Sequence, residues 1–173
     1  MKNIEIKAEC KDLKKVENIL KTLNADFLNR RFQRDMYFKT PKGKLKIRET
    51  DVESDSLIFY KRRKKLNPKK SFYFIYNTEN SSELKEVLKE AFRINVIVEK
   101  LRKVYLFENV RIHLDNVKNL GNFIELEAVI SKNDDEKKSR KNIDFLMEKL
   151  CIKKEDLMKD SYSDMLLLLF QKK

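Results

Sequence analysis

Charged and apolar residues alternate along many separate segments of this chain. Read at every second position, the charged rows are Glu5, Lys7 and Glu9; Lys46 and Arg48; Lys61 and Arg63; Lys100 and Arg102; Arg111, His113 and Asp115; and Glu125 and Glu127. A two-residue period is typical of β-strands, because successive side chains point to opposite faces of a sheet. The chain is therefore predicted to form strands that carry charges on one face and apolar residues on the other.

Turn and capping signals predict the order of the elements. Strands are expected at residues 3–9, 32–39, 44–50, 57–63, 71–76, 96–107, 110–117 and 123–130. Helices are expected after the capping residues Asp12 and Asn80, around Ile143 to Leu150, and over residues 162–170. The proline and glycine at 41 and 43 predict a hairpin turn, and the basic stretch 64–70 predicts a loop.

The length and the cysteine content favour one cytoplasmic domain. A chain of 173 residues with 41% hydrophobic content can bury one core, so residues 1–173 are read as a single domain. The longest apolar run, residues 165–170, is far below the roughly 20 residues that cross a bilayer. Cys10 and Cys151 lack a metal-binding spacing and no secretory signal precedes them, so reduced thiols in a soluble protein are expected.

The charge balance and two absences restrict the function. A formal net charge of +12 favours an anionic partner, which charge alone leaves open among nucleic acid, an acidic membrane face and a phosphorylated small molecule. With two glycines the chain has no glycine-rich phosphate loop, so side chains would have to hold any phosphate. With one histidine, any metal would need mainly carboxylate ligands, which suit Mg²⁺ or Mn²⁺.

The charged rows predict an α+β fold with a closed antiparallel barrel of about eight strands and helices packed outside it. If the rows face inward, the interior holds basic side chains beside several carboxylates. Unpaired buried charges cost several kcal/mol each, so a charged ligand and water are expected to fill the barrel. The alternative is an open sheet with solvated charges, but repetition on at least six strands favours the barrel.

Several short runs then resemble a known family. They are N-I-E-I-K at 3–7, K-I-R at 46–48, E-K-L-R at 99–102, H-L-D at 113–115, G-N-F-I-E-L-E at 121–127 and S-Y-S-D-M-L at 161–166. Their order resembles that of the CYTH superfamily, which contains class IV adenylyl cyclases, thiamine triphosphatases and inorganic tripolyphosphatases. The chain departs from the family's E-x-E-x-K hallmark at its first position, where it has Asn3.

The resemblance implies a metal-dependent enzyme that binds a triphosphate inside the barrel, closest in look to class IV adenylyl cyclases, which convert ATP to cyclic AMP and pyrophosphate. It implies that phosphates are bound by Lys7, Lys46, Arg48, Lys61, Lys100 and Arg102, with Lys7, Arg48, Lys100 and Arg102 as the catalytic set. It implies that Mg²⁺ or Mn²⁺ is held by Glu5, Asp115, Glu125 and Glu127. It also implies a homodimer.

Other functions stay open at this point. An inorganic tripolyphosphatase or a thiamine or nucleoside triphosphatase would need the same positioning and charge neutralisation. The N-terminal run and the compact length favour the cyclase, and the lack of tryptophan weighs against thiamine as the ligand. Asn3 makes a non-catalytic nucleotide- or polyphosphate-binding module a further alternative. Binding of nucleic acid through the net charge is the third, although basic residues inside a barrel argue against specific nucleic-acid or membrane partners.

Overall fold

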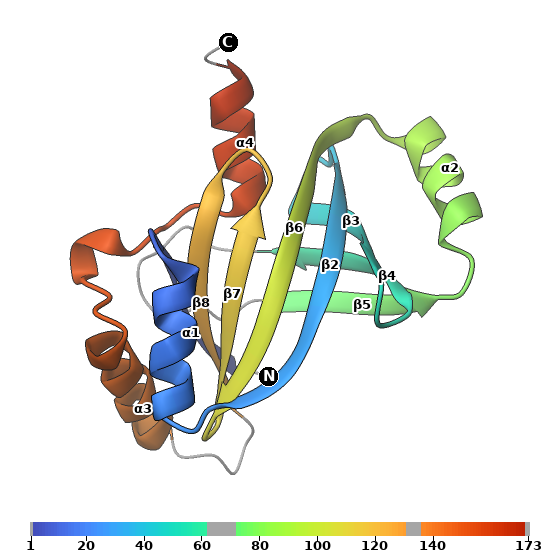
Figure 1. Cartoon of the computed structure of the whole chain (residues 1–173). Helices are drawn as coiled ribbons and strands as arrows, with labels where there is room; N and C mark the ends of the chain where they lie inside the picture. Colours follow the sequence, from blue (N-terminus) through green and yellow to red (C-terminus); the bar gives the residue numbers. More distant parts are fainter. Residues whose placement is uncertain (1, 62–71, 131–135, 172–173) are drawn as a thin grey trace.

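The computed structural model describes residues 2–61, 72–130 and 136–171, so Arg63 and the basic stretch 64–70 lie outside the described residues. The strands are β1 (Lys2–Glu9), β2 (Asp26–Phe38), β3 (Lys44–Thr50), β4 (Asp55–Lys61), β5 (Phe72–Thr78), β6 (Ile94–Phe107), β7 (Val110–Val117) and β8 (Gly121–Ile130). The helices are α1 (Leu13–Thr22), α2 (Ser81–Ala91), α3 (Glu136–Lys149) and α4 (Tyr162–Gln171), with a short 3-10 turn at Lys154–Asp156 (Figure 1).

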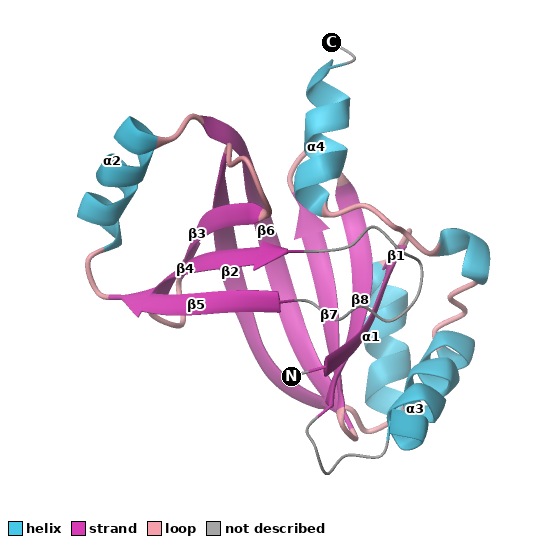
Figure 2. Ribbon diagram, turned by 180° about the vertical axis from the view of Figure 1, so that it is seen from behind, coloured by secondary structure: helices cyan, strands magenta, loops and turns pink. Residues whose placement is uncertain are grey.

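All eight strands belong to one antiparallel sheet with the order β1-β8-β7-β6-β2-β3-β4-β5. The sheet is strongly curved, and Figure 2 shows β3, β4 and β5 running across the direction of β6, β7 and β8. The predicted α+β class and the eight antiparallel strands are confirmed. Closure of the barrel is not confirmed, because no hydrogen bonds between the described residues join the two edge strands β1 and β5.

The central pair of strands is longer than the sequence pattern predicts. β2 begins at Asp26, whereas alternation predicts a start at residue 32. It pairs with β6 from Asp26 opposite Leu106 to Phe38 opposite Ile94. Residues 26–31 lack a two-residue alternation, so pairing with a distant strand extends β2 where the local pattern does not.

Two helices cover one face of the sheet. Leu20 of α1 and Leu146 of α3 pack against Ile112 of β7 and Leu126 of β8, and all four side chains are fully buried. Figures 1 and 2 both show α1 and α3 side by side along this part of the sheet. The face that α1 and α3 cover is called the outer face below, and the opposite face the inner face. Burial of the apolar rows on the outer face leaves the charged rows on the inner face.

Helix α4 closes one end of the inner face. Its Tyr162 and Leu166 pack with Tyr37 of β2, Val96 of β6 and Phe123 of β8 in a buried apolar cluster. The rings of Phe123 and Tyr162 lie 5.0 Å apart between centroids. The inner face therefore has an apolar end under α4 and a charged region beyond it.

Local signals set the element ends as predicted. The Asp12 side chain accepts a hydrogen bond from the backbone N–H of Lys15, and Asn80 accepts one from Glu83, so both residues cap helices. Gly43 has a φ of +74°, and a Cβ there would lie 2.8 Å from the ring of Phe59, so the hairpin turn requires glycine. Within the described ranges, no helix is both long enough and apolar enough to cross a membrane.

Candidate functional site

Five of the basic side chains predicted to bind phosphate lie on the inner face. Lys7 of β1, Lys46 of β3, and Lys100 and Arg102 of β6 are only 6%, 6%, 5% and 8% exposed. Arg48 of β3 lies beside them and is partly buried. Buried lysine and arginine are rare unless they are paired or bind a ligand. Curvature of the sheet therefore gathers these side chains in one shared, sheltered region.

An acid that the sequence analysis did not select organises the β3 part of this cluster. Asp35 of β2 accepts hydrogen bonds from Lys46 Nζ at 2.7 Å and from Arg48 Nε at 2.8 Å. Burial would raise the pKa of the Asp35 carboxyl, but the charges of Lys46 and Arg48 hold it well below its usual range. The apolar Met36 and Phe38 on the opposite face are the signal that could have assigned Asp35 to the inner face.

A second acid organises the β6 part. Asp115 of β7 is completely buried and accepts two hydrogen bonds from Arg102, at 2.7 and 2.6 Å. It also lies 3.6 Å from Lys100 Nζ. Burial would raise the pKa of this carboxyl, but Arg102 and Lys100 lower it. Arg102 additionally donates to Glu125 of β8 at 2.6 Å, which links the basic cluster to the last strands of the sheet.

The electrostatic potential of this cluster is suited to an anion. Burial, with a further contribution from the charge of Arg48, lowers the pKa of Lys46 to about 7. Burial and the charge of Arg102 lower the pKa of Lys100 to about 8. Both ammonium groups are thus destabilised by their surroundings despite the buried acids. A bound polyanion would restore their charged forms.

On the inner face of β1 and β8, acidic side chains outnumber basic ones. Glu5 lies directly opposite Glu127 in the register of these strands, and Glu125 lies opposite Lys7. Burial and the negative charge of Glu125 raise the pKa of Glu127. The inner face is therefore polarised, with basic side chains on β3 and β6 and with Lys7 beside several acidic side chains on β1 and β8.

The acidic edge partly fits the predicted divalent cation. Its carboxylate oxygens are the ligands that Mg²⁺ prefers. Across residues 2–61, 72–130 and 136–171, however, no three acidic, histidine or cysteine side chains form a complete metal site. Mg²⁺ commonly uses one or two carboxylates together with substrate phosphates, which suits Glu5, Glu125 and Glu127. Asp115 does not fit, because Arg102 and Tyr162 already occupy both of its oxygens.

One predicted phosphate-binding residue lies elsewhere. In the register of β3 and β4, Lys46 is opposite Ile58 and Lys44 is opposite Tyr60, so these residues share the inner face. Lys61 follows Tyr60 and is therefore on the outer face, where it is exposed. The structure does not bring Lys61 to the basic cluster.

Tyr162, the first residue of α4, is a second part of the site that the sequence analysis missed. Its hydroxyl donates to Asp115 Oδ2 at 2.9 Å, and its ring lies 4.2 Å from Lys7 Nζ and 5.2 Å from Lys100 Nζ. Such contacts stabilise a cation over a ring face. The start of α4 thus holds two of the inner-face lysines and one buried acid in position.

Local sequence fixes where this helix begins. Ser161 Oγ accepts a hydrogen bond from the backbone N–H of Asp164, and the Asp164 carboxylate accepts one from the backbone N–H of Ser161, in the pattern of a capping box. Lys44 Nζ of β3 donates to both, at 2.6 Å to Ser161 Oγ and 2.8 Å to Asp164 Oδ1. This attachment places Tyr162 over the inner face.

The Tyr162→Phe substitution tests the hydroxyl separately from the ring. Because a hydrogen bond to a buried charged group contributes about 1.5–3 kcal/mol, the free energy of unfolding is expected to fall by that amount in urea titrations. Tyr76→Phe is the matched control: Tyr76 is 66% exposed, and a change below about 0.5 kcal/mol is expected. Equal stabilities of the two variants would contradict a structural role for the Tyr162 hydroxyl.

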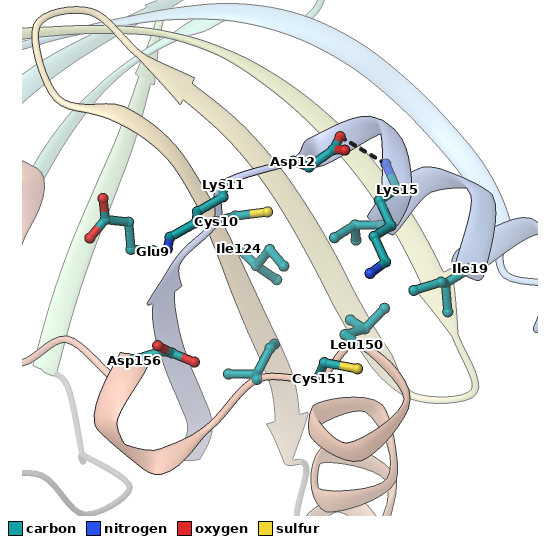
Figure 3. Close-up of a pocket in the computed structure, with 12 residues that line it drawn as sticks. Glu9, Cys10, Lys11, Asp12, Lys15, Ile19, Ile124, Leu150, Cys151 and Asp156 are labelled. Atoms are coloured by element: carbon teal, nitrogen blue, oxygen red, sulfur yellow. Dashed lines mark hydrogen bonds between the residues drawn. The ribbon is translucent and has the colours of Figure 1, made fainter.

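A separate hollow of about 370 Å³ lies away from the inner face, between the end of β1, α1 and the segment after α3 (Figure 3). Its floor includes Ile19, Ile124 and Leu150, and both cysteines of the chain line it. Burial raises the pKa of Cys10, so this thiol is not an activated nucleophile. The hollow lacks the buried basic side chains of the inner face and is not the predicted phosphate site.

Comparison with known proteins assigns the chain to a family. The family model for the CYTH domain matches residues 1–162, so the chain belongs to the CYTH family. A curated relative from Methanocaldococcus jannaschii, named "Putative adenylate cyclase", is 27% identical over 175 residues, which cover 95% of this chain and 98% of the relative.

Solved structures show the same fold. A Pyrococcus horikoshii protein has a TM-score of 0.82 at 22% identity, covering 94% of this chain and 98% of the other. A Hippeastrum protein, whose structure is described as that of a "putative adenylyl cyclase" with a dominant triphosphatase activity, has a TM-score of 0.67 at 14% identity, covering 99% and 96%. At these identities the likeness concerns the fold alone.

Proposed function

We propose that this protein is a metal-dependent enzyme that binds the triphosphate of ATP on the inner face and forms cyclic AMP and pyrophosphate. The observation that carries the proposal is the burial of Lys7, Lys46, Lys100 and Arg102 on one face of the sheet, with the lysine pKa values lowered at positions 46 and 100. The family membership and the name of the Methanocaldococcus relative support the same reaction class.

The basic side chains would hold and neutralise the phosphates. Arg48 and Arg102 can each contact two phosphate oxygens, and the lysines supply point charges. With the phosphates fixed, the ribose 3′-hydroxyl oxygen bonds to the α-phosphorus as the bond from that phosphorus to the bridging oxygen breaks. Pyrophosphate leaves, and the hydroxyl proton passes to water. This chemistry depends mainly on positioning and charge stabilisation and needs no nucleophile from the protein. Bound Mg²⁺ or Mn²⁺, held by one or two of Glu5, Glu125 and Glu127 together with the phosphates, would neutralise additional phosphate charge.

Hydrolysis of a triphosphate is the second candidate reaction. The same basic cluster would bind the phosphates while water attacks a phosphorus atom in place of the ribose hydroxyl. The triphosphatase activity ascribed to the Hippeastrum protein favours keeping this candidate.

Binding of nucleic acid fits the structure less well. Lysine and arginine side chains that contact a duplex backbone have to reach it from an accessible surface. Lys7, Lys100 and Arg102 are instead almost completely buried on the inner face. These residues therefore favour a small triphosphate over DNA or RNA.

A substrate panel tests the proposal. Purified protein is incubated with ATP, inorganic tripolyphosphate or thiamine triphosphate and with Mg²⁺ or Mn²⁺, and cyclic AMP, pyrophosphate and phosphate are measured. Cyclic AMP and pyrophosphate in equal amounts from ATP are expected. Release of phosphate without cyclic AMP would replace the cyclase by a triphosphatase. Tight binding without any product would favour a non-catalytic module, and no binding of any triphosphate would end the proposal.

The lowered pKa of Lys46 predicts a pH dependence of binding. In the free protein this pKa is about 7, so the side chain is mostly neutral above that pH. A bound triphosphate favours the ammonium form, so binding takes up a proton and the affinity falls as pH rises from about 7.5 to about 9. The phosphates themselves are fully ionised over this range. One proton taken up by Lys46 corresponds to a loss of about tenfold per pH unit, and Lys100, whose pKa is lowered to about 8, adds to the slope above that pH.

Isothermal titration calorimetry in two buffers of different ionisation enthalpy measures this proton uptake. The control is Lys46→Arg, whose guanidinium stays charged throughout. The variant is expected to take up about one proton fewer on binding, so its affinity falls less steeply as pH rises. Identical slopes for the two proteins would show that Lys46 does not titrate on binding.

A further inference from the structure

Four polar atoms on β2 and β3 are buried without a hydrogen-bond partner in the described part of the chain. They are Asn29 Oδ1, Arg31 Nε, Gln33 Oε1 and Thr50 Oγ1. Gln33 is 2% exposed. Burying such an atom without a partner costs about 1–3 kcal/mol, so a group of them in one place is typical of a site that a ligand completes.

The strand registers place these atoms beside the basic cluster. Gln33 lies opposite Lys100 on one side and opposite Thr50 on the other, and Arg31 lies opposite Arg102. Directly opposed residues of antiparallel strands point to the same face. The four atoms therefore belong to the inner face, next to side chains that bind phosphate in the proposed function.

They also lie on the side that α4 leaves uncovered. Tyr37 of β2 packs under α4 in the apolar cluster. Along β2, Gln33 is four residues from Tyr37, or about 14 Å in an extended strand, and Arg31 and Asn29 lie farther still. A ligand whose phosphates contact Lys100 and Arg102 can extend towards Asn29, away from the end that α4 covers.

The two amide oxygens among the four atoms distinguish between the phosphates and the sugar of a substrate. An ionised triphosphate offers only hydrogen-bond acceptors, so it cannot pair with the amide oxygens of Gln33 and Asn29. A sugar hydroxyl both donates and accepts, so it can pair with these oxygens, with Arg31 Nε and with the Thr50 hydroxyl. Inorganic tripolyphosphate has no such group.

We infer that Gln33 and Thr50, with Asn29 and Arg31 beyond them, determine substrate specificity by binding the sugar hydroxyls of a nucleoside triphosphate. The inference rests on the proposed function, because it requires that the phosphates occupy the neighbouring basic cluster. It assigns the organic part of the substrate to β2 and β3 and gives these residues no part in phosphate binding.

The Gln33→Leu and Thr50→Val substitutions test the inference, because each removes a polar atom and keeps a similar shape. Dissociation constants for ATP, 2′,3′-dideoxy-ATP and inorganic tripolyphosphate are measured by calorimetry in EDTA, which prevents metal-dependent turnover. Each variant is expected to bind ATP about tenfold more weakly and tripolyphosphate within about twofold of the wild type. The wild-type preference for ATP over the dideoxy analogue is expected to disappear in both variants.

Equal weakening for ATP and tripolyphosphate would overturn the inference, since the residues would then support the phosphate cluster. Unchanged ATP binding in both variants would overturn it as well. Failure of the wild type to bind any triphosphate would instead refute the proposed function on which it rests. Folding is checked by thermal unfolding without ligand, where Gln33→Leu is expected to raise the Tm by about 2–4 °C, because a buried oxygen without a partner is removed.

Discussion

Replacing Arg48 by alanine is expected to lower kcat/KM for the triphosphate substrate by about 10²- to 10³-fold, the usual effect of removing one group that stabilises charge in the transition state. Arg48 lies on the inner face and is held by Asp35 at 2.8 Å in a geometry that leaves its side chain partly accessible. Burial lowers the pKa of the Arg48 guanidinium, but the charge of Asp35 and its hydrogen bond raise it by more. Steady-state rates with the preferred substrate and Mg²⁺ measure the effect.

Lys61→Ala is the matched control for this prediction. It removes a basic side chain of the neighbouring strand that lies on the outer face and is exposed. Its kcat/KM is expected to stay within about twofold of the wild type, as for most surface substitutions. A loss of activity in Lys61→Ala as large as that in Arg48→Ala would mean that phosphate is not bound on the inner face.

The Asp115→Asn substitution is expected to lower the free energy of unfolding by about 3–5 kcal/mol, the usual cost of leaving a buried charge without its partner. Asp115 is completely buried and accepts hydrogen bonds from Arg102 and Tyr162. Lys100 lies 3.6 Å away. The amide keeps the size of the carboxylate but removes its charge, so urea unfolding of the ligand-free protein measures mainly the loss of the ion pairs.

Glu155→Gln makes the same chemical change in an exposed pair. Glu155 lies 3.4 Å from Lys153, with 75% of its side chain exposed, and its removal is expected to cost less than about 1 kcal/mol. Equal free energies of unfolding for Asp115→Asn and Glu155→Gln would contradict the prediction. They would show that Glu125 alone is a sufficient partner for Arg102.

The pH dependence of the Asp115 effect has a definite sign. Burial raises the pKa of this carboxyl, but the charges of Arg102 and Lys100 lower it by a larger amount. The folded-state pKa therefore lies below the unfolded value of about 3.9. The stabilisation is therefore fully present above about pH 4 and is lost as pH falls through the folded-state pKa. The difference between wild type and Asp115→Asn is expected to stay constant from about pH 5 to pH 7 and to shrink in stronger acid.

Where alternation is clear, the sequence predicts the face of each residue correctly. The rows at Lys46 and Arg48, at Lys100 and Arg102, and at Glu125 share the inner face as expected. The prediction is wrong for Lys61, because residues 57–60 are all apolar and give no indication of which face is buried. The pairing of β4 with β3 decides which face Lys61 occupies.

For a related reason, the sequence pattern did not predict that Asp35 and Gln33 belong to the site. Charges occur on both faces of β2: Arg34 on the outer face forms an ion pair with Glu49 at 3.0 Å, while Asp35 pairs with Lys46 on the inner face. Polar residues on both faces weaken the two-residue period of this strand, although Met36 and Phe38 mark its outer face. Pairing with its two neighbours, β3 and β6, places Asp35 and Gln33 on the inner face.

The sequence by itself determined the antiparallel α+β fold, the helix caps, the hairpin at Gly43 and most of the inner-face charges, because each depends on residues close together in the chain. Only the tertiary structure decided which charges meet. Curvature of the sheet brings β3, β6 and β8 to one region, and α4 adds Tyr162 from the far end of the chain. The pairing of Asp35 with Arg48 and of Asp115 with Arg102 depends on strand register, which is set by burial of the opposite, apolar face.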